Sequence, residues 1–259
     1  NFIYRTREFE QMEMEFFVHP DSAEASFREW VDFSRSFFTR LGIRNENLRE
    51  REHTDDERPH YAVAAVDIEY RFSFGWSELE TINNRGDHDL RAHSEHSGRD
   101  LSYFDDQTKE RFLPHVIEPA MGADRTLLAM LCDAYDEEVG EKESRKVLRF
   151  HPDIAPVTVA VLPLSRNEKL VPTARKVYDL LRPNWTTQYD DSQSIGRRYR
   201  RQDEIGTPLC VTVDFETVED DQAVTIRNRD SMSQIRVPID GLEVAIGERL
   251  KELRKESAG

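Results

Sequence analysis

The sequence predicts two domains of different class: an α+β domain with an antiparallel sheet over residues 1–150, then an α/β domain with a mixed sheet over residues 151–259. Residues 9–17 alternate apolar and polar side chains, which is typical of a strand with one solvated face. Residues 157–164 form a continuous apolar run, which is typical of a strand buried on both faces. A chain of 259 residues is also long enough for two domains.

The first strand places Met12, Met14 and Phe16 on one face and carboxylates on the other. Pro20 then opens a helix whose apolar residues recur at helical spacing until Gly42 ends it. The aromatic residues of this stripe are expected to pack in a core rather than to bind a ligand.

Two further strands are predicted over residues 61–72 and 76–82. Residues 86–108 are polar and irregular, which predicts a long surface loop. A strand then leads into a helix that begins at Asp124 or Arg125. Residues 139–146 are charged and predict a connector between the domains.

The second domain alternates apolar strands with amphipathic helices, a pattern typical of a layered α/β domain. The predicted order is strand, helix, strand, helix, strand, strand and helix over residues 157–164, 168–182, 186–191, 194–204, 208–215, 222–229 and 239–255.

The composition suits a soluble protein, because 34% of the residues are charged and 37% are hydrophobic. No run of about 18 apolar residues occurs, so no membrane span is expected. The first ten residues lack the apolar core of a signal peptide, and Cys132 and Cys210 are too few for a disulfide framework. We therefore expect a reducing, cytoplasmic location. The chain also begins as if within a structural element, which suggests a fragment.

A formal net charge of −15 argues at first against a nucleic-acid partner. Acidic residues are concentrated at 52–57 and 214–221, however, whereas residues 196–201 (GRRYRR) are strongly basic. Because an acidic protein can still present one basic face, the net charge leaves an RNA partner possible. The arginines of this segment are Arg197, Arg198, Arg200 and Arg201.

Three segments of the first domain carry chemically informative side chains. They are YRTREFEQMEMEF at 4–16, GWSELETINNRGD at 75–87 and EPAMGADR at 118–125. In this order and at these separations they resemble class II aminoacyl-tRNA synthetases, with YRTREF similar to the second half of motif 2 and GADR similar to motif 3. The finer resemblance is to glycyl-tRNA synthetases of the dimeric type. It continues through the second domain, which resembles an anticodon-binding domain.

The resemblance implies ATP-dependent activation of glycine and its transfer to the 3′ end of tRNA(Gly). It assigns ATP binding to Tyr4, Arg5, Thr6, Arg7, Glu8, Phe9, Glu78, Leu79, Gly122, Ala123, Asp124 and Arg125, with Glu78 and Arg125 as the catalytic pair. It assigns glycine binding to Phe9, Glu10, Gln11, Met12, Glu13, Glu118, Pro119, Ala120, Met121 and Gly122.

Further roles follow from the resemblance. Phe9 would stack on adenine, and Glu78 would hold Mg²⁺, a cation that prefers oxygen ligands. Glu13 and Glu118 would bind the ammonium group of glycine through charge-assisted hydrogen bonds. The basic segment would contact the tRNA backbone. A homodimer is expected from the class.

This sequence departs from the family pattern at two points. Ala120 stands where many relatives have serine, so one hydroxyl contact near the substrate is absent. Motif 1 and the first strand of motif 2 are not found in the sequence, so the isolated segment is expected to be inactive.

Simpler interpretations exist for several of these residues. Taken alone, Glu78 and Glu80 could lie on a solvated strand face, and the family context changes this expectation only for Glu78. Arg125 alone would be an ordinary surface arginine. The histidines at 88, 93 and 96 do not predict zinc, because no cysteine is near and a structural zinc site needs four well-placed ligands.

Two other functions compete with the glycine enzyme. One is a non-catalytic nucleic-acid-binding paralogue of the scaffold, of the polymerase accessory-subunit type, and the presence of Glu13, Glu78, Glu118 and Arg125 together argues against it. The other is a synthetase for threonine, proline or histidine, which the segment FEQMEMEFF argues against.

Overall fold

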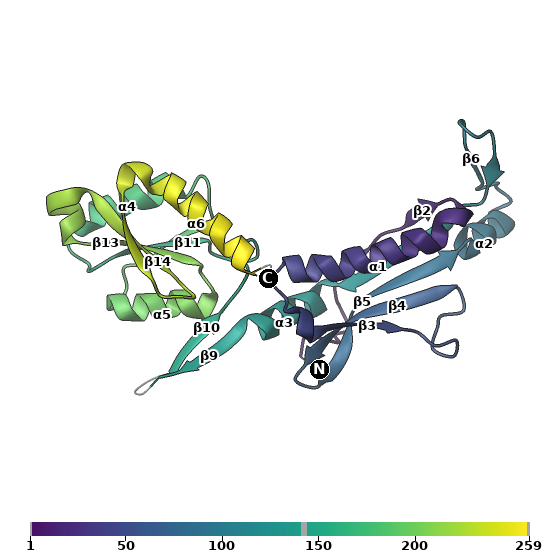
Figure 1. Ribbon diagram of the computed structural model, residues 1–259, viewed down its shortest axis with the longest axis horizontal. Coiled ribbons are helices and arrows are strands. Elements are labelled where there is room, and N and C mark those ends of the chain that lie inside the picture. The colour runs from purple at the N-terminus through teal and green to yellow at the C-terminus, as the bar shows by residue number, and fades with distance from the viewer. Residues whose placement is uncertain (1, 141–143, 258–259) are drawn as a thin grey trace. The chain divides into compact units, whose positions relative to one another are not determined.

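The structure is a computed structural model that describes residues 2–140 and 144–257. The chain forms two compact units, Asn1–Asp133 and Ala134–Gly259 (Figure 1). Among the described residues, no helix is both long and apolar enough to cross a membrane.

The first unit is built on an antiparallel sheet in the order β1-β8-β5-β4-β3, with β2 also pairing with β8. This confirms the predicted sheet type. The strands are β1 (Gln11–Glu13), β2 (Phe16–Val18), β3 (Leu48–Glu52), β4 (Ala64–Phe72), β5 (Gly75–Gly86) and β8 (His115–Gly122).

Helix α1 (Ala23–Arg40) lies along one face of this sheet (Figure 1). Its Phe27 and Phe38 are fully buried against Ile68, Ile82 and other apolar side chains of β4 and β5. The aromatic stripe is therefore core, as expected. The opposite face of the sheet is polar and holds the site described below. Short 3₁₀ helices at η1 (Pro20–Ser22) and η2 (Asn45–Asn47) flank the helix and β3.

Part of the predicted loop 86–108 is wrong, because residues 88–97 form helix α2 (His88–Ser97). This helix buries none of its residues, so it has no apolar stripe to reveal it. Ion pairs between residues four apart, Arg85–Asp89 and Arg91–Asp87, stabilise its start instead. A small two-stranded ribbon, β6 (Tyr103–Phe104) and β7 (Arg111–Phe112), follows.

Helix α3 (Ala123–Ala134) begins within two residues of the predicted start. The chain then turns into strand β9 (Tyr135–Val139), which pairs with β10 (Ser144–Leu148). The predicted connector 139–146 is therefore partly wrong, and its residues 141–143 lie outside the described residues. Arg145 and Arg149 of the hairpin both pair with Glu138 on its other side, so charge pairing holds it together.

The second unit is built on a mixed sheet in the order β12-β11-β13-β14-β15. The first three strands are parallel, and the last two pairings are antiparallel. The strands are β11 (Val159–Pro163), β12 (Thr187–Tyr189), β13 (Leu209–Val213), β14 (Ala223–Asn228) and β15 (Gln234–Pro238). The sequence did not predict β15.

Helices cover both faces of this mixed sheet (Figure 1). Helices α4 (Leu170–Leu181) and α6 (Leu242–Ser257) pack on Val159 and Val161, whereas α5 (Ile195–Ile205) packs on Ala160 and Leu162. Alternate residues of β11 thus enter two different apolar layers, which is why its sequence is continuously apolar. Short turns of helix, η3 (Thr217–Asp221) and η4 (Ile239–Gly241), precede β14 and α6.

Candidate active site

The polar face of the first sheet brings the three sequence segments together. Gln11 of β1 pairs with Gly122 of β8, and Glu80 of β5 pairs with Met121 of β8. Along β8, Ile117 and Met121 face the core, so Glu118, Ala120 and Gly122 face the other side. Segments that are distant in the sequence therefore meet on adjacent strands.

A cavity of about 180 Å³ opens where these strands meet the start of α3. Ten of its eleven lining residues belong to the set that the sequence assigned to ATP and glycine, and the eleventh, Ile3, adjoins that set. The lining residues are Ile3, Tyr4, Thr6, Phe9, Glu10, Gln11, Glu78, Ala120, Gly122, Asp124 and Arg125.

Arg125 is the central cation of this cavity. Its Nη1 donates to Glu78 Oε1 at 2.7 Å, and its Nε donates to the Tyr4 carbonyl oxygen at 3.2 Å. The guanidinium carbon lies 4.7 Å from the centre of the Tyr4 ring, and the Tyr4 hydroxyl donates to the Glu78 carbonyl oxygen at 3.0 Å. Burial raises the pKa of Tyr4, so its hydroxyl keeps its proton. These three residues form one connected group.

A second cavity of about 380 Å³ adjoins the first and shares Tyr4 and Glu78 with it. Its floor is a layer of ion pairs on β3 and β4, in which Arg51 donates to Asp67 at 2.8 Å and to Glu69 at 3.1 Å. This polar layer was not predicted from the sequence. Its signal is present in β4, where Asp67 and Glu69 alternate with Val66, Ile68 and Tyr70.

Glu118 lies at the other end of the polar face, and it is 7% exposed. Arg85 Nη1 donates to both of its carboxylate oxygens, at 3.0 and 2.9 Å, and Asn83 Nδ2 donates to Oε2 at 3.1 Å. The Glu15 carboxyl group lies near Glu118. Burial, together with the charge of Glu118, raises the pKa of Glu15 to about 7. Glu15, two residues after Glu13, was not predicted as a site residue.

Other residues that the sequence assigned to the site lie around it rather than in the first cavity. Glu13 and Met12 are exposed on β1, and Ala123 donates its backbone N–H to the Glu10 carbonyl at 2.9 Å. Arg5 lines the second cavity. Arg7 and Glu8 are exposed.

Three assigned residues face away from the site. Leu79 is fully buried in the core, so its side chain cannot reach a nucleotide there. Pro119 is buried, and Met121 packs against the core below α1. Any contact from these residues to a ligand would come from the backbone.

Glu78 and Glu80 do not share a strand face, contrary to the alternation in the sequence. A bulge lies between them, because Glu80 pairs with Ile68 whereas Glu78 pairs with the next residue, Glu69. Leu79 is the extra residue, and it moves Glu80 to the helix-covered side. There Glu80 is 1% exposed and accepts a hydrogen bond from Ser34 Oγ at 2.9 Å.

Among residues 2–140 and 144–257, no three His, Cys, Asp or Glu side chains lie together as a metal cluster would require. A magnesium ion bound mainly through ATP phosphates needs only one or two protein carboxylates. Glu78 fits that requirement, since it lines both cavities and its side chain is 38% exposed.

The basic segment of the second unit lies within α5, and its arginines project from different sides of that helix. Arg198 is 1% exposed, and its guanidinium donates to the carbonyl oxygens of Pro163, Asp191, Ser192 and Gln193. The predicted tRNA contact by Arg198 is therefore wrong, because this side chain is used within the fold. Arg201 is partly exposed and donates to Asp190 at 2.6 Å, whereas Arg197 and Arg200 are exposed.

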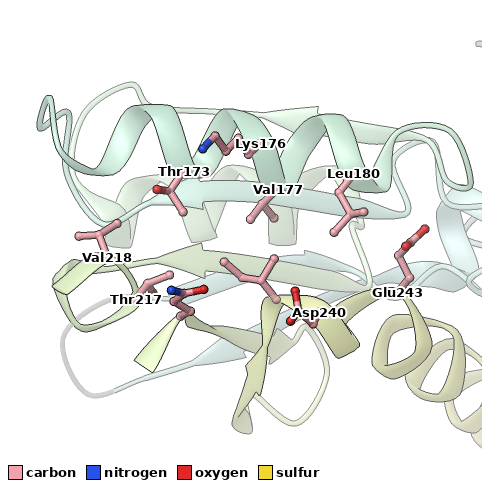
Figure 2. Close-up of a pocket in the computed structure, with 10 residues that line it drawn as sticks. Thr173, Lys176, Val177, Leu180, Thr217, Val218, Asp240 and Glu243 are labelled. Carbon is pink, nitrogen blue, oxygen red and sulfur yellow. The ribbon is translucent and has the colours of Figure 1, made fainter. Parts of the chain in front are cut away.

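A larger groove, of about 790 Å³, lies on the other face of the mixed sheet, beside α4. Figure 2 shows Thr173, Val177 and Leu180 of α4 directed toward the side that carries Thr217 and Asp240. These residues were not predicted from the sequence as a site, and they come from three separate segments.

Comparison with known proteins agrees with this geometry. Residues 158–249 match the family model described as "Anticodon binding domain". The glycine–tRNA ligase of Thermobifida fusca (strain YX) is 54% identical over 258 residues, which cover 96% of this chain and 56% of that protein. The glycine–tRNA ligase of Staphylococcus aureus (strain JH9) is 53% identical over 253 residues, which cover 97% of this chain and 54% of that protein.

Solved structures agree on the fold. The prolyl-tRNA synthetase from Cryptosporidium parvum, complexed with L-proline and AMP, superposes with a TM-score of 0.75 at 19% identity, covering 100% of this chain and 53% of that one. The chain spans about half the length of the curated relatives that it matches. It belongs, over that span, to the glycine–tRNA ligase family, and it has the fold of the class II aminoacyl-tRNA synthetases.

Proposed function

We propose that this chain provides the ATP and glycine sites and the anticodon-binding domain of a glycine–tRNA ligase. The reaction joins glycine to AMP with release of pyrophosphate, and then transfers the glycyl group to the 3′ end of tRNA(Gly). The observation that carries the proposal is the group formed by Tyr4, Glu78 and Arg125 beside the turn at Gly122.

ATP would lie in the first cavity. The Phe9 side chain lines it and is 61% exposed, so its ring is accessible for stacking on adenine. Arg125 would move its charge from Glu78 to the phosphates, and Glu78 would then bind Mg²⁺ together with phosphate oxygens. Catalysis of phosphoryl-group transfer relies mainly on such positioning and charge neutralisation. Arg5, Thr6, Arg7, Glu8 and the turn at 122–124 would complete the nucleotide site.

Glycine would lie between β1 and β8, with its ammonium group against Glu118 and Glu13. Ala120 lines the adjoining cavity and presents only a methyl group there. A pocket walled closely at the α-carbon of glycine would reject larger amino acids by steric clash. Rejection by steric clash discriminates more strongly than the loss of one methylene contact.

The second unit would bind tRNA(Gly). Arg197, Arg200 and Arg201 would contact phosphates on the α5 side of the sheet. The groove beside α4 suits an unstacked base, because Val177 and Val218 form apolar walls (Figure 2). Gln222, which also lines the groove, can bond to a base edge.

The class also implies a homodimer in the cytoplasm, and both are part of this proposal. A non-catalytic nucleic-acid-binding scaffold would not need the ion pair between Arg125 and Glu78 or the carboxylates at 13 and 118. The geometry therefore favours the enzyme over the accessory-subunit function.

The test is amino-acid-dependent ATP–pyrophosphate exchange. This chain would replace the homologous segment of the Thermobifida fusca relative, and the chimera would be assayed with glycine, threonine, proline and histidine. We expect exchange with glycine alone. Exchange with another of the four amino acids, or none from a folded chimera whose unaltered parent is active, would reject the proposal.

A further inference from the structure

One transverse row of side chains crosses the polar face of the first sheet. Directly paired residues on adjacent antiparallel strands carry their side chains on the same face of the sheet. Glu13 of β1 pairs with Ala120 of β8. Ala120 pairs in turn with Thr81 of β5, and Thr81 pairs with Asp67 of β4. These four side chains therefore stand side by side across four adjacent strands.

Ala120 has the shortest side chain of this row, which leaves a gap between Glu13 and Thr81, here called the notch. The strands that carry Glu13 and Thr81 are two strand spacings apart, which is roughly 10 Å between their backbones. Ala120 lines the first cavity, and both Ala120 and Thr81 are half-buried. The notch is thus an opening one residue wide, with a carboxylate on one side and Thr81 on the other.

The Thr81 side chain is held in one orientation. Its Oγ1 donates to Asp67 Oδ1 at 2.8 Å. Asp67 is itself fixed, because it is 3% exposed and accepts a hydrogen bond from Arg51 Nη2 at 2.8 Å. A β-branched side chain has few χ1 rotamers, so the hydrogen bond to Asp67 also determines where the Thr81 methyl group lies. Because the hydroxyl is turned toward β4, only the hydrocarbon part of Thr81 is left to face Ala120.

This inference rests on the proposed function. We propose that Thr81 is a specificity-determining residue of the glycine site, and that its hydrocarbon part forms the wall of the notch opposite Glu13. Glycine lies in the notch over Ala120, with its ammonium group toward Glu13 and its α-carbon beside Thr81. A substrate with a β-carbon would clash with Thr81, and Thr81 cannot turn aside because Asp67 holds its hydroxyl. Rejection of larger amino acids is therefore built into this row.

The first experiment measures kcat/KM for glycine and for L-alanine by pyrophosphate exchange, in the chimera and in three variants at position 81. Thr81→Ala removes the wall, Thr81→Ser keeps only the group that bonds to Asp67, and Thr81→Val keeps the size but not the hydrogen bond. One methyl-sized difference in a pocket changes selectivity by about 10- to 200-fold. Thr81→Ala and Thr81→Ser should therefore lower the preference for glycine over alanine by about tenfold or more, whereas Thr81→Val should keep it.

The second experiment returns the lost volume from the neighbouring strand. Ala120→Ser, added to Thr81→Ala, places one more atom in the notch and should restore much of the preference for glycine. The KM for ATP should stay the same in all the variants at position 81. Thr225→Ala is the matched control, because Thr225 is a half-buried strand threonine of the second unit whose Oγ1 accepts from Arg236 at 3.4 Å. It should change exchange with neither amino acid.

The outcomes separate this inference from the proposed function. Loss of glycine-dependent exchange in the unaltered chimera would reject the function itself. Normal exchange with glycine, and no gain for alanine in Thr81→Ala and Thr81→Ser, would reject only the role of Thr81. An equal loss of preference in Thr81→Val and Thr81→Ala would also overturn it, because the hydrogen bond rather than the size of the side chain would then set the specificity. If Thr81→Ala does not fold, as judged by its melting curve, Thr81→Ser provides the same test with the bond to Asp67 kept.

Discussion

Glu80→Gln should make the first unit more stable at alkaline pH. The substitution removes a buried carboxyl group whose ionised form lowers the free energy of unfolding. Glu80 is 1% exposed, and its only described hydrogen bond is from Ser34. Its second oxygen, Oε2, has no hydrogen-bond partner among the described residues. Burial raises the pKa of Glu80 from 4.5 to about 7, against a smaller lowering effect of the Ser34 hydrogen bond.

The sign and size of the effect follow from this shift. Between pH 4.5 and about 7 the folded protein holds a proton on Glu80 that the unfolded chain releases. The free energy of unfolding therefore falls as the pH rises through this range, by roughly 3 kcal/mol in total. Glutamine keeps the oxygen that accepts from Ser34 and cannot ionise. The variant should thus be more stable than the parent by about that amount at pH 8, and the gain should shrink toward pH 5.

The assay is urea unfolding followed by tryptophan fluorescence between pH 5 and pH 8. A Trp185→Phe background leaves Trp30 and Trp76, which both belong to the first unit. Glu29→Gln removes an exposed carboxylate of the same helix that carries Ser34 and serves as the control. A gain that is absent at pH 8, or that is equal at pH 5 and pH 8, would refute the reasoning.

Three further predictions concern the site and the second unit. Arg125→Gln in the chimera should raise the KM for ATP by about 10- to 100-fold in the exchange assay, because a charge-assisted hydrogen bond is lost, and an unchanged KM would exclude Arg125 from the nucleotide site. Gly206→Ala should destabilise the second unit by about 1–3 kcal/mol in urea unfolding. The φ angle of Gly206 is +83°, and the new Cβ would lie 2.5 Å from Phe150 Cδ2. Equal stability of the variant and the parent would show that the backbone can relax there. Arg198→Met should lower the melting temperature, because it leaves buried carbonyl groups without hydrogen-bond donors. Arg197→Met should leave the melting temperature unchanged. Equal melting temperatures of the two variants would contradict the structural role of Arg198.

Most of the fold could be predicted from the sequence where burial leaves a periodic signal. The apolar runs of β11 and β13 and the stripe of α1 are such signals, because each element is buried against a layer of the core. Helix α2 could not be predicted in this way, since none of its residues is buried and local ion pairs stabilise it.

The sequence predicts which segments form the site, but it does not predict where each side chain of those segments lies. The bulge at Leu79 separates Glu78 from Glu80, and a bulge leaves no mark in the alternation of the sequence. The role of Glu15 could not be predicted for a similar reason. The break between β1 and β2 means that Glu15 does not belong to a continuous strand with Glu13.

The burial of Arg198 did have a sequence signal. Ile195, Arg198, Tyr199 and Gln202 recur at helical spacing, and this side of α5 is the one that packs on the sheet. The number of arginines in the segment does not show which of them are buried. Helical spacing does, because it places Arg198 on the buried side and Arg197 and Arg200 on the exposed side.

The central claim is that residues 4–13, 78 and 118–125 form one site for an adenine nucleotide and glycine. A crystal structure of this chain with a non-hydrolysable analogue of glycyl-adenylate tests it most directly. We predict that the adenine ring stacks on Phe9, that the phosphate group of the analogue contacts Arg125, and that its amino group lies within hydrogen-bond distance of Glu118. An analogue bound on another surface, or no binding by the folded chain at saturating concentration, would contradict the claim.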